Sequence, residues 1–128
     1  MKTYLTIILS LALSCCTSDN VSTDLPGKWI NINTKTDTLT FRLLGGQEYM
    51  ILGRGKELRD GFSLPKSGSG PYEYKLLQDD TISLRWSLSS NSNFNAYYFK
   101  QIGNKITIED FFDTNTSGTK LIFAKLTE

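Results

Sequence analysis

Histidine is absent from this chain of 128 residues, and cysteine occurs only twice, at Cys15 and Cys16. The absence of histidine removes the most common general base and the most common metal ligand of proteins. Because both cysteines lie near the N-terminus, the rest of the chain has no internal disulfide, cysteine zinc site or cysteine–histidine nucleophile. We therefore expect neither a metal nor a cofactor.

An excess of charge of either sign is also missing, because the formal net charge is only +1. A protein that binds nucleic acid through its phosphates needs clustered lysine and arginine. A strongly acidic balance, which would favour a basic partner, is missing as well. The composition therefore predicts no nucleic-acid partner.

Acidic pairs that could act as an acid and a base occur at Asp79–Asp80 and at Glu109–Asp110. Neighbouring side chains on a strand point to opposite faces, so neither pair converges on one substrate. The first pair is typical of a turn, and the second is expected to be solvated at the end of a strand. We therefore expect a binding protein and not an enzyme.

The N-terminal segment has the two parts of a signal peptide. Residues 1–4 carry one positive charge, and residues 5–13 form an apolar run of nine residues. A membrane-spanning helix needs about 20 apolar residues, so this run is too short to span a bilayer. A charged start followed by a short apolar run is typical of a cleaved leader.

The residues that follow, Ser14-Cys15-Cys16, resemble a bacterial lipobox. That resemblance implies a cysteine diacylated at its sulfur that becomes the mature N-terminus. Cys15 is favoured because Ser14 supplies the small residue before it, and Cys16 is the alternative because Leu13 would then occupy the favoured apolar position. Residues 1–15 are thus interpreted as a signal peptide that ends at the lipobox cysteine, and the polar residues 16–25 as a flexible tether to the lipid bilayer.

From Pro26 onward, short alternating runs separated by turn residues predict an all-β domain over residues 26–128. No helix of convincing length is present. Successive hairpins favour an antiparallel up-and-down barrel, in which closure removes the exposed edges. About eight strands are expected, over residues 28–33, 38–44, 48–52, 72–77, 81–88 and 94–102, around 106–108, and over 119–127.

Residues 53–71 form the longest interruption of this pattern, with five glycines and two prolines. A segment of this length is often functional. Its apolar residues Phe62 and Leu64, together with Leu58, are expected to pack down as a lid, to form a short extra strand, or to offer an edge to a partner.

Three short motifs resemble the short lipocalin-like lipoproteins of Bacteroidetes. They are Gly27-Lys28-Trp29 at the first strand, Tyr72-Glu73-Tyr74 in mid-chain, and Phe123-Ala124-Lys125 at the last strand. The resemblance implies a lipocalin-like barrel. It also implies that Lys125 packs against Trp29 as a structural pair where the barrel closes.

The aromatic residues expected to point into the barrel are Trp29, Phe41, Tyr72, Tyr74, Trp86 and Phe123. Either they fill a dry core, or some of them line a ligand pocket. We expect a monomer that is anchored to the outer membrane, on either its periplasmic or its surface side. The resemblance implies that it binds a small apolar or amphiphilic molecule. The alternative is a protein-interaction module with a solid core, such as an inhibitor, an immunity factor or a subunit of an envelope complex.

Overall fold

The computed structural model describes residues 24–111 and 118–127 of the chain. The predicted signal peptide, both cysteines and most of the predicted tether lie outside the described residues. Within the described ranges every regular element is a strand. No helix in this part of the chain is long and apolar enough to cross a membrane.

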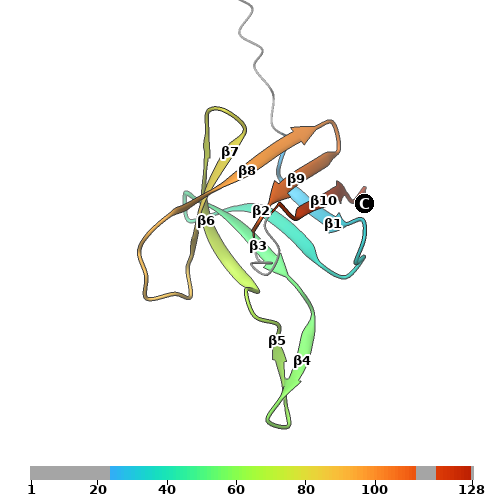
Figure 1. The fold of residues 1–128 in the computed structure, drawn as a ribbon. Helices are drawn as coiled ribbons and strands as arrows, with labels where there is room; N and C mark the ends of the chain where they lie inside the picture. Colours follow the sequence, from blue (N-terminus) through green and yellow to red (C-terminus); the bar gives the residue numbers. More distant parts are fainter. Residues whose placement is uncertain (1–23, 112–117, 128) are drawn as a thin grey trace, which may run out of the picture.

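Eight antiparallel strands close into a barrel in the order β1-β10-β9-β8-β7-β6-β3-β2, and β4 and β5 form a separate two-stranded ribbon (Figure 1). The predicted all-β, eight-stranded antiparallel barrel is therefore confirmed. The strands are β1 (Gly27–Asn31), β2 (Thr38–Leu44), β3 (Gln47–Gly53), β4 (Lys56–Arg59), β5 (Phe62–Pro65), β6 (Gly70–Leu77), β7 (Thr81–Trp86), β8 (Asn95–Ile102), β9 (Lys105–Glu109) and β10 (Lys120–Lys125).

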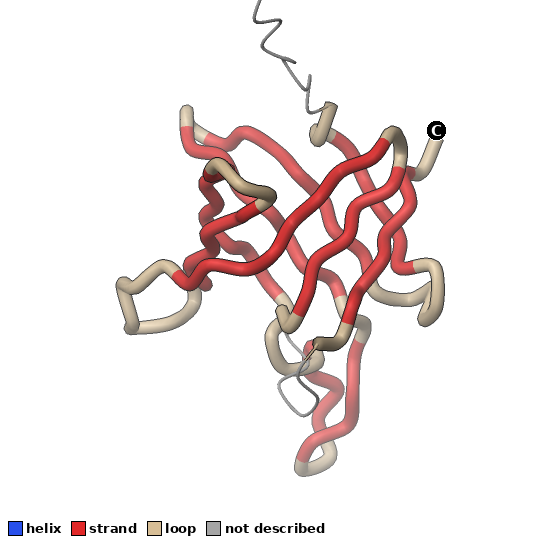
Figure 2. Tube along the Cα trace, turned by 45° about the horizontal axis from the view of Figure 1, so that its top comes forward, coloured by secondary structure: helices blue, strands red, loops and turns tan. Residues whose placement is uncertain are grey.

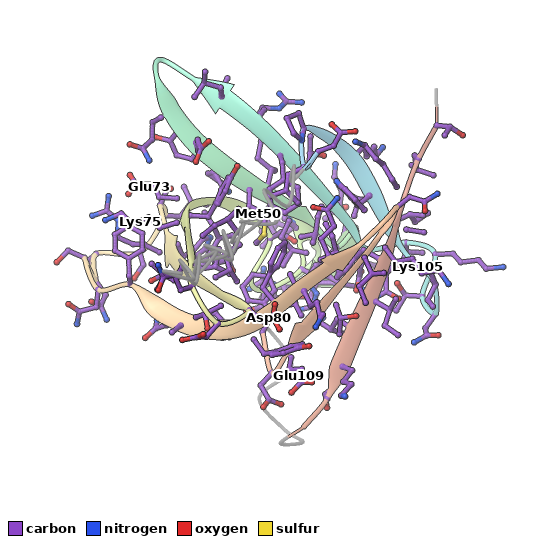
Figure 3. The ribbon with its side chains drawn as sticks, turned by 90° about the horizontal axis from the view of Figure 1, so that it is seen from above. Met50, Glu73, Lys75, Asp80, Lys105 and Glu109 are labelled. Carbon is purple, nitrogen blue, oxygen red and sulfur yellow. The ribbon has the colours of Figure 1, made fainter. Side chains whose placement is uncertain are left out.

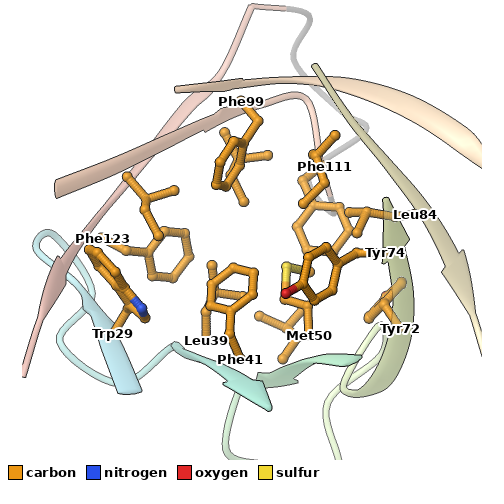
Figure 4. Packing of buried hydrophobic residues seen from close by; sticks show 14 of the residues in the cluster. Trp29, Leu39, Phe41, Met50, Tyr72, Tyr74, Leu84, Phe99, Phe111 and Phe123 are labelled. Carbon is orange, nitrogen blue, oxygen red and sulfur yellow. The ribbon is translucent and has the colours of Figure 1, made fainter. Parts of the chain in front are cut away.

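Side chains alternate between the inside and the outside of this barrel, as the period of two along a strand requires. Seen from above, Met50 lies at the centre, whereas Glu73, Lys75 and Lys105 lie outside it (Figure 3). Figure 4 shows aromatic rings filling much of the interior, and Phe41 and Tyr74 meet edge to face with their centres 5.4 Å apart. The buried apolar set comprises Leu25, Trp29, Leu39, Phe41, Met50, Leu52, Tyr72, Tyr74, Ile82, Leu84, Phe99, Ile106, Ile108, Phe111 and Phe123.

The first and last strands pair with each other, so that Trp29 lies opposite Lys125. The Trp29 indole N–H donates a hydrogen bond of 2.9 Å to the Leu25 carbonyl oxygen, and Leu25 is itself buried. Leu25 therefore belongs to the domain, one residue earlier than the sequence predicted. The chain entering at Asp24 is held by Lys125, whose Nζ is 2.8 Å from an Asp24 carboxylate oxygen.

The strand predicted over residues 81–88 is too long by two residues. Strand β7 ends at Trp86, and the Ser89 amide bonds back to the Trp86 carbonyl oxygen at 3.1 Å. That turn leaves Leu88 exposed, although alternation continued over residues 81–88 would place it on the inward face with Trp86. On β8 both faces hold aromatic residues, so alternation alone does not identify the inward face. The burial of Phe99 identifies it.

The segment predicted as a loop or lid is the β4–β5 ribbon, which extends away from the barrel (Figures 1 and 2). Its turn is formed by Asp60 and Gly61, whose φ angles of 51° and 79° suit a tight hairpin. Leu58, Phe62 and Leu64 are exposed and do not cover the barrel. The expectation of a lid is therefore wrong, whereas that of an extra strand is right.

The two ends of the barrel carry different turns and connections (Figure 2). The end where the chain enters at Asp24, called the entry end, carries the β2–β3, β6–β7 and β8–β9 turns, because neighbouring strands run in opposite directions. The other end, called the mouth end, carries the β1–β2 and β7–β8 connections and the ribbon. This division decides which side chains can form a common site.

Candidate functional site

A hollow of about 240 Å³ opens at the mouth end, between the ends of β6, β7 and β8. We call it the mouth hollow. Both aromatic and polar side chains line it, in the combination typical of a site for an amphiphilic molecule. The lining residues are Tyr72, Leu84, Trp86, Ser89, Asn91, Asn93, Asn95 and Tyr97.

Four aromatic rings in series form the mouth hollow and its floor. Trp86 stacks on Tyr72, with ring centres 6.4 Å apart and planes 24° from parallel. Phe111 lies beneath and meets Tyr72 at 5.1 Å and Tyr97 at 5.4 Å, both edge to face. Phe111 is buried and belongs to the barrel core, so its ring connects Tyr72 and Tyr97 of the mouth hollow to that core.

Tyr72 and Trp86 differ in what they offer to a ligand. The Tyr72 hydroxyl is already used, because it donates a 2.7 Å hydrogen bond to the Gly68 carbonyl oxygen. Trp86 is 36% exposed, although it lies directly across the strand pair from Tyr72. A large aromatic side chain left this open at the edge of a hollow offers a surface for a second ring to stack on.

The backbone at Gly70 allows Trp86 to take this position. A Cβ atom at Gly70 would lie 3.2 Å from the Trp86 Nε1 and 3.0 Å from a Leu88 methyl carbon. Its φ of 129° is also one that residues with a side chain rarely adopt. Glycine at this position therefore permits the close approach of the Trp86 indole to the start of β6.

The polar wall comes from the connection between β7 and β8. The Asn91 carboxamide oxygen accepts a hydrogen bond of 2.9 Å from the Asn93 amide, which orders the loop. Among the described residues, none is bonded to the side-chain amides of Asn93 and Asn95. Each amide can therefore donate two hydrogen bonds and accept others.

A second hollow, of about 200 Å³, lies on the outer side of Trp86. It shares Trp86, Ser89 and Asn91 with the mouth hollow, and its far wall holds the ion pair of Arg85 with Glu73. Trp86 thus stands between the two hollows. One face of the site is charged and the other is aromatic, which again suits a molecule with both polar and apolar parts.

The structure separates the six aromatic residues that the sequence assigned to ligand binding. Tyr72 and Trp86 meet at the mouth hollow, whereas Trp29, Phe41, Tyr74 and Phe123 lie buried in the barrel core. The predicted structural pair lies at the other end, where Lys125 Nζ is 5.4 Å from the Trp29 ring centre. Phe62 and Leu64 lie on β5 of the ribbon.

The residues of the acidic pairs lie in turns or bond to neighbouring residues of the barrel. Asp79 and Asp80 form the β6–β7 turn, both with positive φ, and Asp80 pairs with Lys100 at 3.3 Å. One Asp110 carboxylate oxygen accepts bonds from the amides of Gly118 and Thr119. Within residues 24–111 and 118–127, no three acidic, histidine or cysteine side chains gather as metal ligands do.

Burial at the mouth end changes the acidity of its tyrosines. Burial, with a smaller effect from Tyr97, raises the pKa of Tyr72 to about 12, against the opposing charge of Arg54. Burial also raises the pKa of Tyr97 and of Tyr74 above the ordinary value. A proton held more tightly in the folded state makes stability depend on pH only at alkaline values.

We expect the wild-type protein to lose stability as the pH rises from 10 to 12. The Tyr72 phenol ionises near pH 10 in the unfolded chain and near pH 12 in the folded one, so its contribution is intact below pH 10 and falls across that range. The measurement is the urea midpoint as a function of pH, with phenolate absorbance recorded in parallel.

The variant Tyr72→Phe should be about 1 kcal/mol less stable at neutral pH, because it loses the hydrogen bond to the Gly68 carbonyl oxygen. Its stability should nevertheless fall less steeply between pH 10 and 12. Equal alkaline slopes in the two proteins would contradict this prediction.

Residues 89–97 supply most of the site that the sequence did not predict. Residues 89–93 lie between the strands expected over 81–88 and 94–102, and Tyr97 lies on the second of these, where both faces hold aromatic residues. Phe111 was not singled out, because it follows the alternating run of β9 instead of belonging to it. The one available signal was the concentration of asparagine beside aromatic residues over residues 91–98.

The mouth hollow can hold a ring against Trp86 while asparagine amides bind polar substituents. It lies at the edge of the barrel and not within it, because Phe111 and the buried aromatic residues fill the space below. Comparisons of this chain with protein-family models, with curated proteins and with solved structures give no match.

Proposed function

We propose that this protein is an envelope lipoprotein that binds a small amphiphilic molecule at the mouth of its lipocalin-like barrel. The observation that carries the proposal is the exposed Trp86 ring, stacked on Tyr72 and facing unbonded asparagine amides across a hollow of about 240 Å³. Ligand pockets commonly enclose about 300–1,000 Å³. The ligand is therefore expected to be small, with a single ring or short chain and several hydrogen-bonding groups.

Binding at this site requires no catalytic group. The apolar part of the ligand stacks on the Trp86 ring, and its polar part bonds to the amides of Asn93 and Asn95. Displacing water from an aromatic face while retaining hydrogen bonds at its rim is favourable for an amphiphilic molecule. An entirely apolar ligand would leave those amides without water or protein partners, so it is the less suitable class.

We expect Trp86→Ala to release the ligand. The test is native mass spectrometry of the full lipoprotein, isolated gently from its host, with the additional mass removed by denaturation. Loss of a central aromatic contact costs about 2 kcal/mol, which is roughly thirtyfold in affinity. The matched control is Leu88→Ala, because Leu88 is exposed nearby but does not line the mouth hollow.

The result that supports the proposal is an additional mass on the wild type and on Leu88→Ala that is absent from Trp86→Ala. An additional mass that persists in Trp86→Ala would place the ligand elsewhere. A single mass without ligand for all three proteins would favour the second candidate function.

The second candidate is a protein-interaction module, and the exposed apolar residues of the ribbon favour it. Leu58 is 79% exposed and Phe62 is 69% exposed, on a hairpin that extends beyond the barrel. Replacing residues 54–69 with a short glycine–serine turn should abolish the capture of a protein partner while leaving the barrel folded. Retention of a partner by the shortened protein would exclude the ribbon as the interface.

A further inference from the structure

Exposed aliphatic side chains gather on the turns of the entry end. Each of the three hairpins at this end carries at least one, and the last described strand is followed by another. They contribute little to folding, because a side chain that stays in water buries little apolar surface. The set is Leu43, Leu44, Leu76, Leu77, Ile102 and Leu126.

Turn geometry does not account for these residues. The turns themselves are made by Gly45–Gly46, by residues 78–80 and by Gly103–Asn104, which are ordinary turn residues. The aliphatic side chains flank them, where polar residues would serve equally well. The β1–β2 connection at the mouth end, residues 32–37, is more polar, because Ile32 is its one apolar residue.

Two lysines accompany the aliphatic side chains. Lys105 lies across the β8–β9 turn from Ile102, and the Leu126 amide bonds to the Lys28 carbonyl oxygen at 2.8 Å. Neither lysine forms an ion pair with a described residue. A long lysine side chain beside exposed leucine or isoleucine can place its ammonium group at lipid phosphates while the apolar neighbour enters the membrane.

The apolar surface continues from Ile102 down the outer wall of the barrel. A hollow of about 250 Å³ there is lined by Ile102, Ile122 and Ile32, with Lys100 and Lys105 beside them. The outer wall that adjoins the entry end at Ile102 is therefore more apolar than a row of isolated exposed residues would be. Extended apolar patches of this kind mark protein or membrane contacts.

The path of the chain favours a membrane contact over a protein contact for this surface. Asp24 is fixed at the entry end by its bond to Lys125. Eight residues lie between Cys15 and Asp24, and the nine residue steps from one to the other span at most roughly 30 Å. An acylated cysteine would therefore hold the bilayer nearest to the entry end, where the described chain begins.

We propose that the entry end is a membrane-docking surface, with its aliphatic turns in the interface of the bilayer that holds the lipid anchor. This inference rests on the proposed function, because it assumes that Cys15 or Cys16 is acylated. Such contacts reach about 5–10 Å into the boundary between head groups and acyl chains. The mouth hollow then faces away from the membrane, where a ligand can enter from water.

The test places one nitroxide label on the full lipoprotein, reconstituted in vesicles of phosphatidylethanolamine and phosphatidylglycerol. The labelled variants are Ile102→Cys and Leu77→Cys at the entry end, with Leu58→Cys and Leu88→Cys at the mouth end as matched exposed controls. Whichever of Cys15 and Cys16 carries no acyl group is first replaced by serine. Collisions of the label with dissolved oxygen and with a water-soluble nickel complex report its depth.

The labelled lipoprotein is measured first in buffer without detergent, where a carrier protein keeps it soluble, and then in the vesicles. In the vesicles, the labels at 102 and 77 should collide more often with oxygen and less often with the nickel complex. Those at 58 and 88 should not change. Equal access of nickel to all four labels would overturn the inference, and so would insertion of the 58 or 88 label. Spin–spin broadening at 102 that depends on protein concentration would instead identify a second copy as the occupant. Absence of any acyl mass would contradict the proposed anchor itself, which separates the two failures.

Discussion

Replacement of Trp29 with alanine is expected to destabilise the domain by about 3–5 kcal/mol. Trp29 is 0% exposed, and its indole N–H bonds to the Leu25 carbonyl oxygen. The substitution leaves a cavity where β1 meets β10 and removes the ring beneath the Lys125 ammonium. Because domains of this size are stable by only about 5–15 kcal/mol, this single change removes a large share of the total.

The matched control is Trp86→Ala, since the chain has only two tryptophans and they lie toward opposite ends of the barrel. Trp86 is partly exposed, and the main packing it loses is its stack on Tyr72, worth about 0.5–1.5 kcal/mol. Urea unfolding followed by circular dichroism gives both values. Each variant keeps one tryptophan, so its fluorescence reports one end of the barrel alone.

A Trp29→Ala midpoint no lower than that of Trp86→Ala would contradict the buried position of Trp29. Lys125→Met adds a finer test of the same contact. Lys125 bonds to Asp24 as well as lying over Trp29, so its loss should free the entering chain while leaving the core filled. A modest loss of about 1 kcal/mol is expected for a partly exposed pair of this kind.

The barrel could be predicted from the sequence because each of its strands has one solvent-exposed face and one buried face. Ile82 and Leu84 alternate with polar residues on β7, and Leu39 and Phe41 do so on β2. A period of two carries this information only where one face is buried. The ribbon buries neither face, so its alternation carried no signal, and only the Asp60–Gly61 turn marked it as a hairpin.

The mouth hollow could be predicted only in part. The inward direction of Tyr72 and Trp86 followed from strand alternation, but the point at which each strand ends did not. Trp86 lies at the edge of the site because β7 stops there, and Phe111 closes the floor from a distant part of the sequence. Contacts between segments far apart in the chain depend on the completed barrel, and no local pattern encodes them.

The position of the site also changes what the lipocalin-like resemblance implies. An eight-stranded barrel is either filled by side chains or holds one small ligand. Here the aromatic residues fill the lower part, with Phe41 and Tyr74 in contact, and the hollow remains only at the rim. A ligand bound at the rim stays partly in water, which is consistent with an amphiphilic molecule and with a loop that offers amides.

Replacement of Cys15 and Cys16 together with serine is expected to abolish acylation and to release the protein from the membrane. Serine cannot form the thioether that carries the diacyl group, so the change is complete and not graded. Each buried methylene contributes about 0.8 kcal/mol to membrane binding, and two or more chains anchor a protein stably. The measurement is the intact mass of the full chain, combined with its partition between membrane and soluble fractions.

The single variant Cys16→Ser provides the matched control, because it alters the same segment while keeping the favoured acceptor. Acylation lost only in Cys15→Ser would assign the anchor to Cys15. Loss only in Cys16→Ser would move it to Cys16, and the mature protein would then be shorter by one cysteine residue. Retention of the acyl mass in the double variant would contradict a lipobox at either position. With Cys15 as the acceptor, Cys16 stays beside the membrane as a free thiol, where a thiol-reactive reagent added from the aqueous side distinguishes the two assignments without any mutation.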